Sequence, residues 1–256
     1  MNAIHRQQVR DAFSAARDYD RHARVQRMVA RRLAKRIAEL DLPEHPRILE
    51  IGCGTGFLTE ALVGEGLTGN WLVTDISPAM VERCRARIGE NPDVRFAVLD
   101  GEYGNPGASA RFDLVCSSLV MQWFEDPASA LARMLGWLVP GGHCLFATLA
   151  SGSLAEWRAA HDAEGLDCGT PRFLALGELE ASNPAAREGD LAVERFTENQ
   201  GSASVFLHSL KAIGAGTAAA GHHPLSPAEL RRVMRRFEQS GARVTYEVVT
   251  GHYRGQ

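Results

Sequence analysis

Cysteine is scarce in this sequence, and none of its five cysteines forms a C-x-x-C pair. They are odd in number and spread from Cys53 to Cys168, so we expect reduced thiols rather than a disulfide framework, a zinc site or a redox pair. His222 and His223 stand before Pro224 without further ligands at suitable spacing. The sequence therefore predicts no metal.

Long apolar runs are missing as well. No stretch approaches the roughly 20 residues of a membrane-spanning helix, and the polar, arginine-rich amino end lacks the apolar block of a signal peptide. The net charge of −3 argues against a nucleic-acid partner. We expect one domain of 256 residues, monomeric and cytoplasmic, that binds neither membranes nor nucleic acid.

Apolar periodicity indicates the fold class. Residues 25–40 carry apolar side chains at helical spacing, which predicts an amphipathic helix packed on a larger body. Short β-rich runs then alternate with helical segments, which is typical of βαβ units and a parallel sheet. The expected strands are 47–51, 71–76, 94–99, 112–117 and 143–149, with a terminal strand at 244–253.

A glycine turn follows the first expected strand, in the sequence RILEIGCGTGF. At Gly52, Gly54 and Gly56 the missing side chains let a ligand lie against the backbone. The dinucleotide fingerprint G-x-G-x-x-G would need glycine at Phe57. The carboxylate of Glu50 would repel a pyrophosphate but suits a ligand that carries an ammonium and a sulfonium. The turn therefore favours S-adenosylmethionine over NAD.

Further candidate binding residues stand where the other strands end, which is where ligands bind in open α/β sheets. Asp75 follows the turn at about the spacing of an acidic residue that accepts hydrogen bonds from ribose hydroxyls. Taken alone, such an aspartate is as often a helix cap. The expected cofactor contacts are Asp75, Ile76, Met80, Asp100 and Gly101, with Ser117, Ser118 and Leu119 beside the reaction centre.

The motifs EIGCGTG, VTDIS, VLDGE and LVPGG, between residues 50 and 142, resemble those of class I S-adenosylmethionine-dependent methyltransferases. The resemblance implies an α/β fold with a Rossmann-like sheet in the order 3-2-1-4-5-7-6 and strand 7 antiparallel. It also implies an amino-terminal helical lid (1–44), a cofactor-binding half (45–150), an inserted helical substrate region after strand 5 (151–194) and carboxy-terminal strands and helices (195–256).

The segments AFSAARDYDRHARVQ, SSLVMQWFEDP, LASGSLAEW with PRFL, HSLKAIGA, LRRVMRRFE and VTYEVVTG resemble a narrower family. They are similar to malonyl-acyl carrier protein O-methyltransferases of the BioC type. This implies methylation of the free malonyl carboxylate, which leaves S-adenosylhomocysteine and gives an ester that primes pimelate synthesis for biotin. The acidic carrier protein would meet a basic surface, either residues 24–36 or Arg231, Arg232, Arg235 and Arg236.

The resemblance also implies site residues. Tyr19 and Gln26 would contact cofactor or substrate, although Tyr19 and Trp123 could instead pack the lid. His22 is a further candidate, but a lone histidine is more often structural. The residues implied at the reaction centre are Tyr19, His22, Gln122, Trp123 and Arg172.

Arg172 would hold the substrate carboxylate in a bidentate pair, or else neutralise neighbouring acids. Because a malonyl carboxylate is already ionised at neutral pH, a general base has nothing to remove. Catalysis would then come from alignment and from exclusion of water.

Two alternatives stay open: a methyltransferase for another small carboxylic acid such as trans-aconitate, and a non-catalytic S-adenosylmethionine-binding protein. A nucleic-acid methyltransferase is disfavoured, because SSLV stands where an N-P-P-Y-type motif would be expected.

Overall fold

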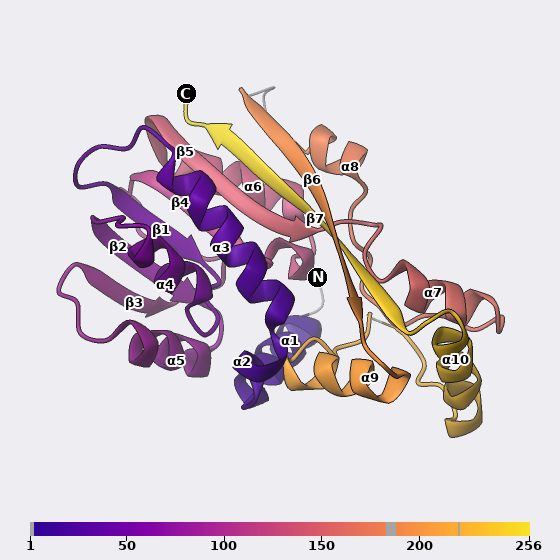
Figure 1. Cartoon of the computed structure of the whole chain (residues 1–256). Coiled ribbons are helices and arrows are strands. Elements are labelled where there is room, and N and C mark those ends of the chain that lie inside the picture. Colours follow the sequence, from indigo (N-terminus) through magenta and orange to yellow (C-terminus); the bar gives the residue numbers. More distant parts are fainter. Residues whose placement is uncertain (1–2, 183–187, 220) are drawn as a thin grey trace.

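The computed structural model describes residues 3–182, 188–219 and 221–256 (Figure 1). One seven-stranded sheet runs through it in the order β3-β2-β1-β4-β5-β7-β6. The strands are β1 (Arg47–Ile51), β2 (Asn70–Asp75), β3 (Val94–Val98), β4 (Phe112–Ser118), β5 (Leu138–Leu149), β6 (Gly189–Asn199) and β7 (Arg243–Arg254). Strands β1 to β5 pair in parallel, whereas β7 is antiparallel to both neighbours. The predicted sheet order and strand direction are confirmed.

Helices precede the first strand and alternate with the later ones, and the chain ends on β7 (Figure 1). They are α1 (Ala3–Ala15), α2 (Tyr19–His22), α3 (Arg24–Ala38), α4 (Phe57–Gly64), α5 (Pro78–Ile88), the short 3-10 helix η1 (Met121–Trp123), α6 (Pro127–Gly136), α7 (Ala155–Asp162), α8 (Leu176–Ala181), α9 (Ala203–Ala212) and α10 (Pro227–Gln239). Helix α5 begins where the sequence predicts, because the Ser77 hydroxyl accepts the Met80 N–H at 3.2 Å and Pro78 occupies the first turn. None of the described helices combines the length and apolar character needed to cross a membrane.

The central strands are buried on both faces, so alternate side chains enter different cores. On β1, Ile48 packs in a cluster with residues of α3, α4 and α5. The next residue, Leu49, packs in a second cluster with residues of α6. A third cluster joins α7, α9 and α10 to the beginning of β7. The helices of the carboxy-terminal half therefore have a core of their own beside the sheet (Figure 1).

The structure corrects three sequence boundaries. Helix α3 buries Val29, Leu33 and Ile37 against the sheet, so it is part of a core layer rather than of a lid over residues 1–44. Strand β6 spans Gly189–Asn199, so the expected boundary at residue 194 falls inside a strand. Strand β5 begins at Leu138 rather than at residue 143, because a bulge on β5, between the pairs Phe112–Leu138 and Leu114–His143, accommodates the Pro-Gly-Gly stretch.

Candidate functional site

The glycine turn after β1 adopts backbone angles that favour glycine. Gly52 and Gly54 have φ of 70° and 54°. A Cβ on Gly52 would lie 2.3 Å from Cγ2 of Val120, so the close approach of the β4 end also requires glycine. Gly56 has another role, since it precedes α4 and a Cβ there would lie 3.0 Å from Cys84 Sγ on α5.

A cavity of about 100 Å³, here named the small cavity, lies against this turn at the carboxyl ends of β1, β2 and β4. The predicted ligand residues that line it are Tyr19, Gly52, Gly54, Asp75, Ile76, Met80, Asp100 and Gly101. Ser118 and Leu119 line it too, whereas Ser117 does not. Neighbouring side chains on a strand point to opposite faces, so Ser117 points away from the face that Ser118 presents. Ser117 is fully buried, and its Oγ has no hydrogen-bond partner among the described residues.

Asp75 organises the turn from the end of β2. Its Oδ2 accepts the Gly54 N–H at 2.9 Å and its Oδ1 accepts the Ser77 N–H at 2.8 Å. Burial raises the pKa of this carboxyl, and the backbone hydrogen bonds oppose that rise. The aspartate thus supports the glycine turn and the residue that caps α5 at once, in addition to lining the cavity.

Glu50 is 1% exposed on β1, directly before two residues that line the small cavity. Thr59 Oγ1 donates to its Oε2 at 2.7 Å, but Oε1 has no hydrogen-bond partner among the described residues. Burial raises the pKa of this carboxyl to about 7, and the nearby charge of Asp75 adds to the rise. A buried carboxylate with an unpaired oxygen is unfavourable unless a cation compensates it. This group and the glycine cradle fit the ammonium and sulfonium of S-adenosylmethionine.

Asp100 has an unforeseen partner on α1. Its Oδ1 accepts the N–H groups of Glu102 and Tyr103 at 2.9 and 3.1 Å, and its Oδ2 accepts Arg6 Nη1 at 3.1 Å. The Arg6 guanidinium also lies 4.5 Å from the centre of the Tyr103 ring. Arg6 lines the small cavity, and no motif in the sequence singles it out.

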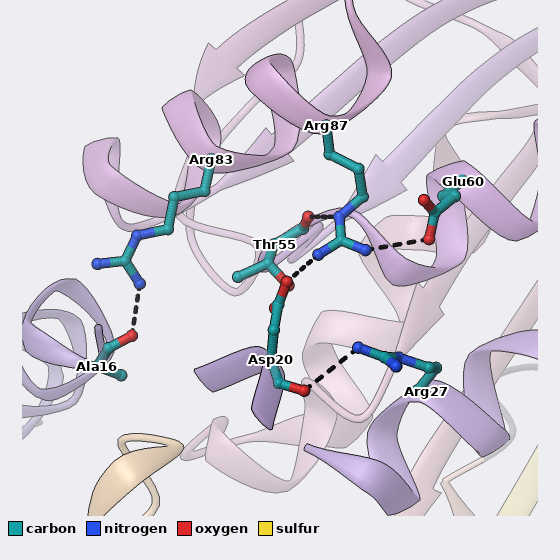
Figure 2. Close-up of polar contacts among 7 residues, drawn as sticks. All are labelled: Ala16, Asp20, Arg27, Thr55, Glu60, Arg83 and Arg87. Atoms are coloured by element: carbon teal, nitrogen blue, oxygen red, sulfur yellow. Dashed lines mark hydrogen bonds and ion pairs between the residues drawn. The ribbon is translucent and has the colours of Figure 1, made fainter. Parts of the chain in front are cut away.

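Polar contacts fasten the amino-terminal segment to the sheet helices (Figure 2). The Asp20 carboxylate accepts Thr55 Oγ1 of the glycine turn at 2.7 Å and forms an ion pair with Arg87 of α5. Arg83 of α5 donates to the Ala16 carbonyl at 2.6 Å. These contacts hold α1 and α2 across the carboxyl ends of the strands.

A second cavity of about 800 Å³, the large cavity, adjoins the first. Both cavities are lined by Phe13, Tyr19, Leu119 and Trp123, so they meet at these residues. Residues of α1, α3, α7, α9 and α10 complete its wall, which is mainly apolar. Gln26 lines the large cavity but not the small one.

Trp123 lies at the junction, and Gln122 lines the large cavity beside it. Gln122 Nε2 donates to the Leu119 carbonyl at 2.7 Å, and its Oε1 accepts Thr148 Oγ1 at 3.2 Å. The Trp123 ring meets Phe13 edge to face, with centroids 5.4 Å apart. These contacts fix both side chains, and Trp123 thereby also packs α1.

Two candidate residues lie away from the large cavity. The Arg172 side chain is 71% exposed and forms an ion pair with Glu178, so it neutralises a neighbouring acid instead of facing that cavity. It lines a side cavity of about 440 Å³ that shares Gln122, Trp123, Leu149 and Pro171 with the large cavity. His22 packs against His208, with ring centroids 5.3 Å apart, and lines neither of the two adjoining cavities.

Comparison with known proteins shows the family. A family model described as a methyltransferase domain matches residues 49–146. The biotin biosynthesis bifunctional protein BioCD of Bordetella avium is 44% identical over 243 residues, which are 94% of this chain and 51% of that protein. The chain thus spans about half of that relative.

A second relative is matched over nearly its whole length. The malonyl-acyl carrier protein O-methyltransferase of Magnetococcus marinus is 39% identical over 244 residues, which cover 94% of this chain and 90% of that protein. The crystal structure of YcgJ from Bacillus subtilis shares the fold, with a TM-score of 0.64, 13% identity and coverage of 88% and 98%. The chain belongs to the malonyl-acyl carrier protein O-methyltransferase family.

Proposed function

We propose that this protein transfers a methyl group from S-adenosylmethionine to the free carboxylate of malonyl-acyl carrier protein, and that the resulting ester primes pimelate synthesis for biotin. The observation that carries the proposal is the junction of the two cavities. A cavity at the glycine turn meets a mainly apolar acceptor cavity of about 800 Å³ at Tyr19, Leu119 and Trp123. The identity to a relative of that name over most of both chains supports this assignment.

Glu50, Asp75 and Asp100 would hold the cofactor, with the backbone of Gly52 and Gly54 against it. When bound, S-adenosylmethionine supplies an electrophilic methyl group on a positively charged sulfur. The three carboxylates match its ammonium, sulfonium and hydroxyl groups in charge and hydrogen-bonding character.

The acceptor side works by excluding water. No aspartate, glutamate or arginine is among the described residues that line the large cavity, and the residues where it meets the small cavity are Phe13, Tyr19, Leu119 and Trp123, so a carboxylate that reaches the junction loses hydration without gaining an ion pair at that point. That loss makes its oxygen a better nucleophile. Burial and nearby Asp75 raise the pKa of Tyr19, which therefore remains a neutral phenol that can donate a hydrogen bond at the junction. Gln122 and Trp123 would orient the acceptor beside it.

Helices α1 and α2 would act as the lid. With α1 in place the small cavity measures about 100 Å³, whereas small-molecule sites usually measure about 300–1,000 Å³. We propose that α1 moves outward when a ligand of the size of S-adenosylmethionine enters. The contacts of Arg6 and Asp20 are the ones that such a movement changes.

The carrier protein would dock on α2 and α3. A groove of about 520 Å³, here named the arginine groove, is lined by Asp20, Arg21, Arg24, Arg27, Met28, Arg31, Arg32 and Lys35. Arg24 and Arg32 form ion pairs with Glu198 and Glu194 of β6. Arg21, Arg31 and Lys35 have no acidic partner among the described residues, so the groove keeps a net positive charge. Val25 and Gln26 of the same helix line the large cavity.

The basic residues of α10 are less suited to docking. Arg232 and Arg236 both form ion pairs with Glu164, at 2.9 and 2.8 Å. This leaves Arg231 and Arg235 as the exposed cations of that helix without an acidic partner in the described chain. We further propose a cytoplasmic monomer that contacts neither nucleic acid nor a membrane.

Mass spectrometry of malonyl-acyl carrier protein, free malonate and aconitate, each incubated with the protein and S-adenosylmethionine, tests the function. We expect one methyl group on the carrier-bound malonyl group. Methylation confined to the free acids would refute the carrier substrate and leave a small-acid methyltransferase. Tight cofactor binding without any product would instead indicate a non-catalytic binding protein.

A further inference from the structure

Lys211 is the one lysine, arginine, aspartate or glutamate among the described residues that line the large cavity. It lies near the end of α9, within the HSLKAIGA motif. Lys211 is exposed, so it stands where the cavity opens to solvent. Its ammonium forms no ion pair with any acidic residue that the structure describes.

The surroundings of Lys211 favour an anionic ligand. Leu207 and Leu210 of the same helix line the apolar wall. A ligand that fills the cavity therefore meets apolar side chains inside and reaches water at the rim, where Lys211 lies. An ammonium on a flexible stem can follow an oxyanion there without a fixed geometry. Arg172, the cation expected from the sequence, pairs with Glu178 and lines the adjoining side cavity rather than the large one.

We propose that Lys211 is the anion-binding residue of the acceptor cavity and holds an oxyanion of the substrate. Two groups of a malonyl thioester on a phosphopantetheine arm share this chemistry, namely the phosphate of the arm and the malonyl carboxylate. The exposure of Lys211 favours the phosphate, because the carboxylate must reach the junction at Tyr19 and Trp123. The inference rests on the proposed function.

Two small acceptors distinguish the two oxyanions, namely malonyl-4′-phosphopantetheine and malonyl-pantetheine without the phosphate. Since a hydrogen bond to a charged group contributes about 1.5–3 kcal/mol, Lys211→Met should raise KM for the phosphorylated acceptor by roughly tenfold or more. The kcat should stay unchanged and Lys211→Arg should restore most of the affinity. An unchanged KM for malonyl-pantetheine assigns the phosphate, whereas an equal rise for both acceptors assigns the carboxylate.

Arg235→Met is the matched control, since it removes an exposed cation of α10 that lines neither adjoining cavity. The assignment would be overturned if Lys211→Met kept the KM values of the wild-type protein for both acceptors. So would a rise that Arg235→Met reproduces. If the wild-type protein methylates neither these acceptors nor malonyl-acyl carrier protein, the proposed function fails first.

Amine labelling tests the site without turnover. The chain has lysine only at positions 35 and 211, so mass spectrometry after a limited dose of an amine-reactive reagent resolves both. We expect 4′-phosphopantetheine to slow labelling of Lys211 several-fold and to leave Lys35 unchanged. The assignment would be overturned if Lys211 were labelled at the same rate without ligand, with 4′-phosphopantetheine and with malonyl-pantetheine.

Discussion

Replacing Glu50 with glutamine should flatten the pH dependence of the stability of the cofactor-free protein. Burial raises the pKa of this carboxyl from 4.5 to about 7. The folded protein therefore retains a proton that the unfolded chain releases, and folding is favoured at low pH. The favourable contribution is complete below about pH 4.5 and is lost as the pH rises through 7.

The magnitude follows from the two pKa values. One pKa unit corresponds to about 1.4 kcal/mol, so the ionised carboxyl destabilises the folded state by about 3 kcal/mol at pH 8 relative to pH 4.5. Glutamine cannot ionise, and it keeps an oxygen that can accept the Thr59 hydroxyl. Between these pH values the free energy of unfolding of Glu50→Gln should therefore lose about 3 kcal/mol less than that of the wild-type protein.

Urea unfolding of both proteins between pH 5 and 8.5, without cofactor, measures this difference. Glu65→Gln serves as the control, because Glu65 is an exposed acid that follows α4, and its profile should run parallel to that of the wild type. If the Glu50→Gln and wild-type profiles also run parallel, the buried carboxyl is not the titrating group. The argument about Glu50 would then be refuted.

The same substitution should be unfavourable for cofactor binding. A cation beside Glu50 favours its ionised form, so binding near pH 7 should release part of a proton from this group. Calorimetry in two buffers of different ionisation enthalpy measures that release. Glu50→Gln should bind S-adenosylmethionine at least tenfold more weakly, and its binding should release no proton from this position. An unchanged affinity would contradict the cofactor role.

Three further predictions concern the glycine turn, the arginine groove and a histidine pair. Gly52→Ala should lower stability by about 1–3 kcal/mol in thermal unfolding and weaken cofactor binding, because φ is 70° and the new Cβ would lie 2.3 Å from a neighbouring side chain; an unchanged melting temperature would contradict this. Arg31→Glu should raise KM for malonyl-acyl carrier protein and reduce its salt dependence, with no effect on malonyl-pantetheine, whereas Arg235→Glu should change neither. Burial lowers the pKa of both His143 and His252, whose ring nitrogens lie 2.9 Å apart. Their contribution to stability is therefore present above about pH 6.5 and is lost as the pH falls. His252→Phe should flatten the pH dependence of the free energy of unfolding between pH 7 and 5, and an unchanged dependence would exclude this pair.

The fold and the cavity at the glycine turn could be predicted because short segments encode them. The turn from β1 into α4 brings Gly52 and Gly54 to the sheet edge through backbone conformation alone. Parallel strands end at the same edge, which brings Asp75 and Asp100 to the same cavity although they are distant in sequence. The alternation of strands and helices therefore predicts both the sheet and the place of these side chains.

The acceptor side could not be predicted in the same way, because long-range packing decides which face a side chain presents. Arg172 belongs to a recognisable segment, yet its guanidinium pairs with Glu178 six residues later. Lys211 and Arg6 meet the cavities because α9 and α1 pack beside them. No spacing in the sequence encodes either position.

The walls of the large cavity also contain backbone that local preferences oppose. Three described residues other than glycine have positive φ, and two of them, Leu119 and Leu154, line this cavity. A leucine in that conformation costs about 1–2 kcal/mol and persists only where surrounding structure imposes it. The backbone conformation of Leu119 is fixed at the end of β4. Its N–H donates to the Ala147 carbonyl at 2.8 Å, and its own carbonyl accepts Gln122 Nε2. Together with the ionisable, incompletely paired Glu50, these residues concentrate unfavourable free energy around the two cavities, and the packing of the rest of the fold must offset it.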